Sequence, residues 1–220
     1  MKKVLMSLAF MFFIWASNAQ YDAGKILMTG GLNFSSTTPK YEVKSGGSTT
    51  TTDGTKITLF GINLSGGYFI ADNIAVGLGI GFENSKSTSE SDNAKMTDTD
   101  NMLSVAPFAR YYIPYSDQFA FFGQLTAGFG FGKSKDEVTS GSTTTTTETD
   151  NSMVMVGISP GFSFMMTEKV GLEMRYGFLG WSSYTSKTEG TGDDYAKLTT
   201  STFGLNLDLN SLVFGISVLF

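Results

Sequence analysis

Large apolar residues alternate with small or polar residues along much of the chain. Between residues 74 and 82 every even position is large and apolar, and every odd position is Ala or Gly. A period of two is typical of a β-strand with two different faces. Because the second face is almost stripped of side chains, we expect it to line a narrow interior while the apolar face meets lipid.

The same alternation recurs in seven other segments, so eight strands are expected. On the segment 170–181 the apolar face is read as Val170, Leu172, Met174, Tyr176 and Phe178. The other segments are at about residues 25–34, 57–70, 102–113, 119–132, 153–166 and 212–220.

Three places interrupt the pattern. Pro107 and Pro160 fall inside expected strands, where a missing N–H removes a ladder hydrogen bond, so a β-bulge is expected at each. Residues 203–209 alternate on odd positions, whereas the C-terminal segment alternates on even ones. The phase therefore slips near Asn210 and Ser211, either through a bulge or because two separate elements meet there.

The connections between the expected strands alternate in length. Residues 71–73, 114–118 and 167–169 are short turns, while residues 35–56, 84–101, 133–152 and 182–202 are long and polar. The prediction is an all-β chain, an eight-stranded antiparallel up-and-down transmembrane β-barrel with short periplasmic turns and four long external loops. The Ser- and Thr-rich loops should be mobile, although the strands could extend some way into them.

The N-terminus has the features of a secretory leader. Lys2 and Lys3 precede an apolar run over residues 4–16, and Ser17-Asn18-Ala19 supplies the small residues of a cleavage site. We expect a signal peptide over residues 1–19 and one barrel domain over residues 20–220. A buried N-terminal helix is the alternative. No later stretch approaches 18 consecutive apolar residues, so no transmembrane helix is expected.

Composition narrows the chemistry. The chain has no His, no Cys and a formal net charge of −5. Without His it lacks the commonest general base, and without Cys it has no disulfide or thiolate metal site. The acidic balance argues against nucleic-acid binding. No catalytic, cofactor-binding or metal-binding residue is therefore assigned, although the acidic loops leave divalent-cation binding open.

Four charged residues fall on the expected inner face: Glu83, Arg110, Glu173 and Arg175. Unpaired charges in a narrow interior are expensive, so these should pair, and we expect Arg110 to bond Glu173. This lumen charge cluster has two interpretations. It is a polar plug that fills the interior, which the small diameter favours, or it is a charged constriction that passes ions.

Three segments carry a resemblance to a known family: residues 107–113 (PFARYYI), 159–162 (SPGF) and 211–220 (SLVFGISVLF). With them the chain resembles the small outer-membrane β-barrel family that includes OmpX and the membrane domain of OmpA. The resemblance covers the whole expected mature chain. It is specific for the barrel and unspecific for function.

This resemblance implies a place in the bacterial outer membrane, among outer-membrane lipids and lipopolysaccharide. It also implies contact with the barrel-assembly machinery and periplasmic chaperones during biogenesis. The folded protein is expected to be a monomer. The C-terminal assembly signal is implied to comprise Phe214, Ile216, Val218 and Phe220.

The expected function is that of a non-enzymatic integral outer-membrane protein with a structural or surface-interaction role. A narrow pore for ions or small solutes is the alternative. A lipid-modifying enzyme is a remote alternative, because abundant Ser and Thr without a base do not make a nucleophilic site.

Overall fold

Antiparallel β-strands make up almost all of the described chain. The computed structural model describes residues 21–91, 94–190, 194–207 and 212–220. The expected leader, residues 1–19, and the expected phase slip at Asn210 and Ser211 lie outside these residues. The strands are β1 (Ile26–Thr37), β2 (Lys40–Ser45), β3 (Ser48–Asp53), β4 (Lys56–Ala71), β5 (Ile74–Ser91), β6 (Ala94–Pro114), β7 (Phe119–Ser140), β8 (Thr143–Met165), β9 (Val170–Tyr176), β10 (Phe178–Glu189), β11 (Tyr195–Asn206) and β12 (Leu212–Leu219).

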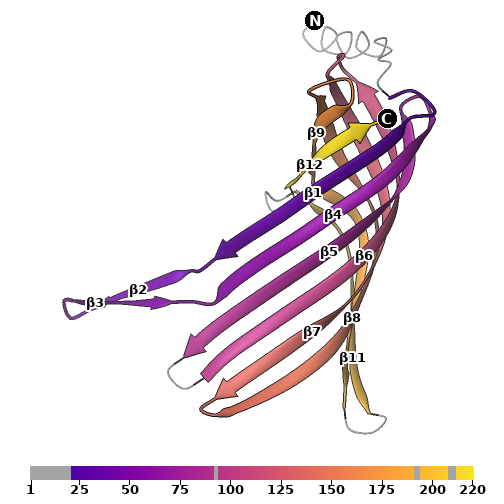
Figure 1. Cartoon of the computed structure of the whole chain (residues 1–220). Helices are drawn as coiled ribbons and strands as arrows, with labels where there is room; N and C mark the ends of the chain where they lie inside the picture. Colours follow the sequence, from indigo (N-terminus) through magenta and orange to yellow (C-terminus); the bar gives the residue numbers. More distant parts are fainter. Residues whose placement is uncertain (1–20, 92–93, 191–193, 208–211) are drawn as a thin grey trace, which may run out of the picture.

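Ten of these strands belong to one sheet that closes on itself at one end. The order is β11-β10-β8-β7-β6-β5-β4-β1-β12-β9, and β9 also pairs with β8. Hydrogen-bonded neighbours therefore run from β8 through β7, β6, β5, β4, β1, β12 and β9 back to β8. We call this closed circuit the ring. It lies at the end of the molecule that carries the short turns (Figure 1).

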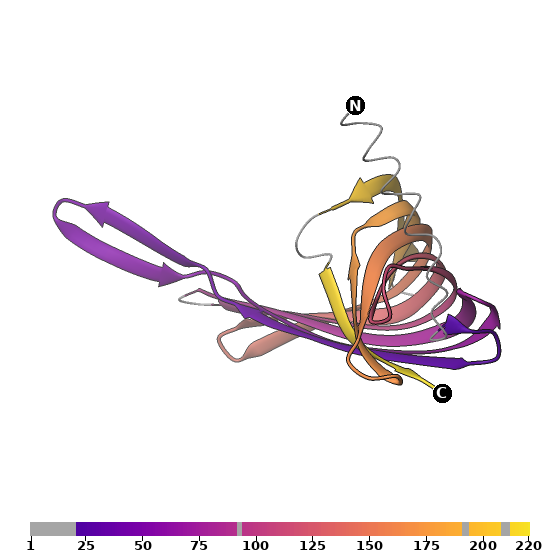
Figure 2. The same cartoon turned by 90° about the horizontal axis from the view of Figure 1, so that it is seen from above.

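Away from the ring the sheet is open and its strands fan apart (Figure 1). The pairs between β1 and β12 run only from Leu27↔Leu219 to Gly30↔Ile216. Further out, β10 pairs with β8 and β11 pairs with β10, and within the described residues no pairing joins β11 to β1. The hairpin of β2 and β3 forms a second sheet that projects to one side (Figure 2).

Most of the described residues in the expected long loops are paired strands. The β6–β7 ladder continues to Ala94↔Ser140, and the β7–β8 ladder continues to Ser140↔Thr143. The expected extension of the strands into the loops is confirmed, and these segments are paired strands instead of irregular loops. Thr is β-branched and suits an extended backbone, and its hydroxyl groups meet across the strands, as between Thr139 and Thr144 at 3.0 Å. The twelve strands therefore do not reproduce the expected eight segments one by one.

A bulge at Gly177 divides the expected seventh strand into β9 and β10. Gly177 has a φ of +78°, a left-handed conformation that glycine adopts without steric cost. Three residues, 176–178, face only Ser159 and Pro160 between the pairs Gly161↔Arg175 and Leu179↔Ile158. The expected bulge at Pro160 is thus confirmed, with the extra residue on the partner strand.

The bulge changes which side chains face outward. A Cβ atom at Gly157 would overlap the Phe178 ring, so that ring covers Gly157 on the inner face. Leu179 and Trp181 are instead exposed on the outer face. The prediction that Phe178 lies on the apolar outer face is therefore wrong, because one extra residue reverses the alternation.

Pro107 causes only a gap in the ladder. The β6–β7 pairs stop at Val105↔Phe129 and resume at Phe108↔Thr126 with no residue gained on either strand. The expected bulge at Pro107 is therefore wrong, and the missing N–H is accommodated by two unpaired positions.

The two faces of the sheet differ as the alternation predicts. Exposed apolar side chains cover the outer face, among them Met28, Leu64, Leu78, Phe129, Ile158 and Ile216. Leu205 pairs with outward-facing Leu179, whereas Leu212 pairs with Tyr176. The odd-numbered and even-numbered alternations near the C-terminus thus belong to separate strands, β11 and β12.

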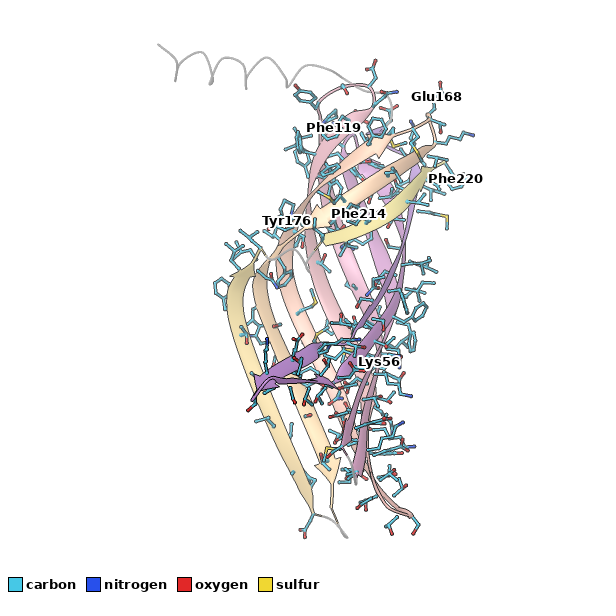
Figure 3. The ribbon with its side chains drawn as sticks, turned by 90° about the vertical axis from the view of Figure 1, so that its left-hand side faces the viewer. Lys56, Phe119, Glu168, Tyr176, Phe214 and Phe220 are labelled. Carbon is cyan, nitrogen blue, oxygen red and sulfur yellow. The ribbon has the colours of Figure 1, made fainter. Side chains whose placement is uncertain are left out.

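The C-terminal residue lies at the end that carries the short turns, where Figure 3 also places Phe119 and Glu168. The Leu219 N–H donates to the Lys169 carbonyl oxygen at 2.7 Å, and the Phe220 N–H donates to the Ile26 carbonyl oxygen at 3.0 Å. The described residues include no helix with the length and apolar character needed to cross a membrane.

Candidate functional site

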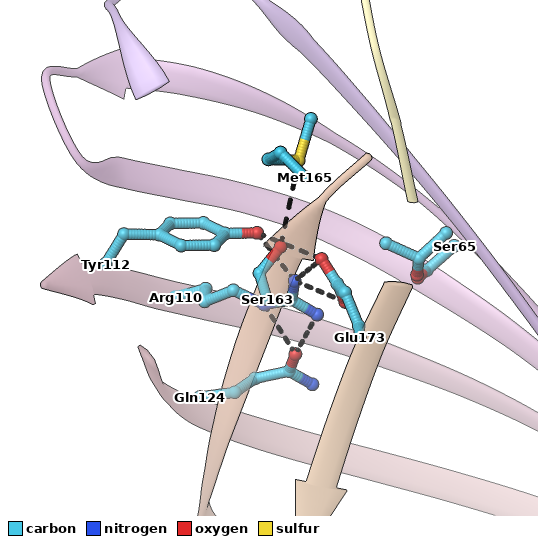
Figure 4. A network of polar contacts seen from close by, with 8 residues as sticks. Ser65, Arg110, Tyr112, Gln124, Ser163, Met165 and Glu173 are labelled. Atoms are coloured by element: carbon cyan, nitrogen blue, oxygen red, sulfur yellow. Dashed lines mark hydrogen bonds and ion pairs between the residues drawn. The ribbon is translucent and has the colours of Figure 1, made fainter. Parts of the chain in front are cut away.

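A buried ion pair crosses the interior of the ring (Figure 4). Arg110 on β6 directs Nη1 at both carboxylate oxygens of Glu173 on β9, at 2.8 Å each. The two side chains are only 2% and 6% exposed. Since β6 and β9 are not neighbours in the sheet, the pair ties opposite parts of the ring together.

Neighbouring side chains satisfy the remaining polar atoms of this pair. Arg110 donates from Nε and Nη2 to Gln124 Oε1 at 3.0 and 2.7 Å, and from Nη1 to the Tyr112 hydroxyl at 2.7 Å. The Tyr112 hydroxyl donates to Glu173 Oε1 at 3.3 Å, and Gln124 Nε2 donates to Thr126 Oγ1 at 2.9 Å. Such full satisfaction is what makes a buried charge pair tolerable.

Aromatic rings enclose the guanidinium group. The Arg110 Cζ atom lies 4.2 Å from the centroid of the Phe122 ring, 5.5 Å from that of Tyr112 and 5.6 Å from that of Phe108. Cation–π attraction therefore adds to the ion pair. Glycine leaves the room for Phe122, because a Cβ atom at Gly161 would collide with its ring.

The strand register explains this convergence. Arg110 is directly opposite Gln124 on β7, and Glu173 is directly opposite Ser163 on β8. Inward-facing positions on β6, β7 and β9 thus reach the same level of the ring. The alternation predicts the face of each side chain, but only the closed circuit brings β9 across from β6.

The four charged residues expected to form one cluster do not all meet. Arg110 and Glu173 bond as expected. Arg175, two residues along β9, is partly buried and makes no ion pair within the described residues. Glu83 on β5 is exposed and is opposite Gly61 and Met102.

A hydrophobic plug fills the ring beside the ion pair, at the end that carries the short turns. Tyr21 stacks on Tyr112 with ring centroids 4.2 Å apart, and Phe69 and Phe122 pack against Tyr112 at 5.6 and 5.5 Å. The buried plug residues are Tyr21, Leu27, Phe69, Ala75, Tyr112, Ala120, Phe122, Met165 and Leu219.

Backbone hydrogen bonds hold the N-terminal part of the plug. The Asn73 N–H donates to the Tyr21 carbonyl oxygen at 2.7 Å, and the Gly24 N–H donates to the Phe69 carbonyl oxygen at 2.8 Å. Sequence reasoning missed this plug. The available signal was that large apolar residues such as Leu27 and Phe69 occupy inner-face positions close to the ends of strands.

The polar side chains of this network bond mainly to one another. Both Glu173 oxygens and all three side-chain nitrogens of Arg110 are committed within the network. Among the described residues no group of three or more His, Cys, Asp or Glu side chains could hold a metal ion. The expected C-terminal signal residues form one outward row, in which Phe214, Ile216 and Phe220 are exposed and Val218 is partly buried.

Solved structures similar to the chain are outer-membrane proteins. OprG from Pseudomonas aeruginosa is 17% identical, with 91% of this chain and 97% of that chain covered and a TM-score of 0.40. Neisserial surface protein A is 13% identical (90% and 98% covered, TM-score 0.39), and Ail of Yersinia pestis is 16% identical (90% and 99% covered, TM-score 0.36).

No curated protein sequence matches the chain. The model of one family, described as outer membrane protein beta-barrel domain, matches residues 5–210. This match covers most of the chain. It includes the whole of every strand from β1 to β11, which are nine strands of the main sheet and the two strands of the side hairpin. The chain belongs to the outer membrane protein β-barrel domain family.

Proposed function

We propose that the chain forms an eight-stranded up-and-down barrel in the bacterial outer membrane and has a structural or surface-interaction role without conducting ions. The observation that carries this proposal is the closed interior. The Arg110–Glu173 pair crosses the ring, and the hydrophobic plug fills the ring beside it. Eight strands enclose a space that side chains can fill.

In this proposal, β9 and β10 form one strand that is bent at Gly177, and the two separate strands β11 and β12 take the place of the last barrel strand. The hairpin of β2 and β3 extends the connection between β1 and β4. Both chain ends then lie at the periplasmic side, and the long hairpins face outward as the contact surface.

The chain would reach the membrane after removal of a signal peptide over residues 1–19. The outward row of Phe214, Ile216, Val218 and Phe220 would be read by the barrel-assembly machinery, with periplasmic chaperones guiding the unfolded chain. The folded monomer would lie among outer-membrane lipids and lipopolysaccharide.

Gel migration tests the barrel itself. A barrel of this kind should migrate faster unheated than boiled, because the closed ladder resists detergent until it is heated. Identical migration of both samples would contradict the closed barrel.

Planar-bilayer recording tests the closed interior. The purified, refolded chain should give no unitary conductance above that of empty micelles, because the plug and the ion pair obstruct the interior. Reproducible current steps that change with Arg110→Ala, but not with the exposed control Lys56→Ala, would support a narrow pore instead. The observation that favours this second candidate is a small cavity beside Arg175.

The proposal assigns no catalytic activity. Sustained release of fatty acid from phospholipid or lipopolysaccharide by the purified chain, at a rate proportional to its concentration, would contradict it.

A further inference from the structure

The interior of the ring contains more positive than negative charge near the ion pair. Arg110 and Arg175 are both cationic, and Glu173 is the carboxylate beside them. Both oxygens of Glu173 already accept from Arg110 Nη1, and one also accepts from the Tyr112 hydroxyl. One cation is therefore left uncompensated at this level.

Arg175 is that cation. It is opposite Gly161 on β8 and Val213 on β12, and it is partly buried. Within the described residues, its guanidinium takes part in no hydrogen bond and in no ion pair within 4 Å. An arginine has five N–H donors and no acceptor, so a partly buried one without an acceptor is costly.

A cavity of about 40 Å³, lined by polar and apolar residues, lies next to Arg175. Polar side chains of Thr29, Asn63, Ser65 and Glu173 line it together with the Arg175 side chain. The hydroxyl groups of Thr29 and Ser65 hydrogen-bond each other. Whichever of these hydroxyls accepts in that bond keeps its own proton, so one hydroxyl donor is available to a further acceptor.

Three glycines and two apolar residues complete the cavity wall: Gly30, Gly31, Val213, Phe214 and Gly215. Gly31 and Gly215 lie where β1 and β12 approach, and a Cβ atom at Gly31 would come within 2.9 Å of the Phe214 carbonyl oxygen. A side chain at this position would not fit. The close approach of the two strands therefore keeps this stretch of the wall free of side chains.

We propose that this cavity binds one small monovalent anion, a halide or a small carboxylate, through the Arg175 guanidinium. The anion would neutralise the excess charge and accept from Arg175 and from the free hydroxyl donor. The volume corresponds to roughly three water molecules, which suits an ion of the size of chloride or formate. The carboxylate of Glu173 does not repel it fully, because Arg110 neutralises Glu173.

This inference is independent of the proposed function. It depends on the inward face of β9 and on the pairing of β1 with β12, and it holds whether or not the interior conducts ions.

Thermal unfolding of the full chain in detergent micelles tests the proposal. At constant ionic strength, sodium gluconate is replaced stepwise by sodium formate or sodium chloride, since gluconate is too large for the cavity. The midpoint temperature of unfolding of the wild-type chain should rise by roughly 2–4 °C, because an anion that binds only the folded state stabilises it by mass action.

Two variants give this experiment its specificity. Arg175→Gln should abolish the rise and should be at least as stable as the wild type in gluconate. Lys56→Gln removes one exposed positive charge and should keep the rise. An equal rise in Arg175→Gln, or no rise in the wild type, would overturn the proposal.

A direct observation is available if Arg175→Gln does not fold. Crystals of the wild-type chain grown with bromide should show an anomalous peak within hydrogen-bonding distance of the Arg175 guanidinium. Bromide peaks only at surface positions, with ordered water in the cavity, would refute the assignment.

Discussion

Arg110 Nη1 lies 2.8 Å from both carboxylate oxygens of Glu173, although 63 positions along the chain separate the two residues. The pair is buried, and it joins β6 to β9 across the ring. It therefore restrains the distance between two strands that share no backbone hydrogen bond.

Removing one charge of this pair should destabilise the protein far more than removing both charges together. Glu173→Gln leaves the Arg110 charge buried and uncompensated, so the free energy of unfolding should fall by about 3–5 kcal/mol. The double variant Arg110→Met with Glu173→Gln should recover much of that loss, because neither charge of the pair remains. Urea unfolding in micelles measures both. Losses that simply add in the double variant would contradict this coupling.

The bulge at Gly177 should not accept a side chain. Gly177→Ala places a Cβ atom on a backbone with φ of +78° and within 2.8 Å of the Asn206 carbonyl oxygen. The free energy of unfolding should fall by about 1–3 kcal/mol. Gly66→Ala is the matched control, because a Cβ atom there meets nothing within 4 Å. Equal effects of the two substitutions would argue against a strained position at Gly177.

Tryptophan fluorescence can test which side chains face outward after the bulge at Gly177. The chain has two tryptophans, Trp15 in the expected leader and Trp181 on β10, so a chain that begins at Gln20 has a single tryptophan, which can be excited selectively at 295 nm or above. Trp181 points outward, and lipids brominated on their acyl chains should quench its emission strongly. Weak quenching by these lipids combined with strong quenching by aqueous acrylamide would place Trp181 inside instead.

The stability of the hydrophobic plug should depend on Tyr21, the first residue that the structure describes. Tyr21 is 3% exposed and stacks on Tyr112. Tyr21→Ala should lower the free energy of unfolding by about 3–5 kcal/mol, as truncation of a buried aromatic does. Tyr41→Ala on β2 is the control, since that side chain is 62% exposed. A change of stability in neither variant would show that the plug does not need Tyr21.

Lower pH should stabilise the outer part of the β6–β7 hairpin. Asp136 is directly opposite Asp98, and partial burial together with the charges of Asp98 and Asp100 raises the pKa of Asp136. A carboxyl group whose pKa is raised in the folded state contributes stability that is fully present below its unfolded pKa. That contribution is lost as the pH rises through the folded-state pKa.

Amide hydrogen exchange, corrected for the intrinsic rate, measures this effect. Protection of residues 94–100 should increase as the pH falls from 7 towards 4. Asp136→Asn should give the higher protection already at neutral pH and remove the dependence. The control Asp53→Asn, on the separate β2–β3 hairpin, should leave the pH dependence of this protection unchanged. A pH dependence that persists in Asp136→Asn would assign it to other groups.

The sequence by itself determined the local features of this protein. A period of two requires strands with two faces, and it correctly predicts outward positions such as Leu78 and Ile216 and inward positions such as Arg110 and Glu173. Charge is costly on an inner face, so pairing of Arg110 with Glu173 could also be predicted. These inferences succeed because alternation and desolvation act within one strand or one face.

Tertiary structure alone decided how the faces combine. A single glycine in a left-handed conformation turned Phe178 inward, because one extra residue inverts every later position on a strand. Closure of the ring brought Glu173 to Arg110 and left Arg175 beside a cavity. It also brought Tyr21 onto Tyr112, a contact that no local pattern encodes. Register and closure depend on backbone hydrogen bonds between distant segments, and hydrophobic periodicity does not specify these.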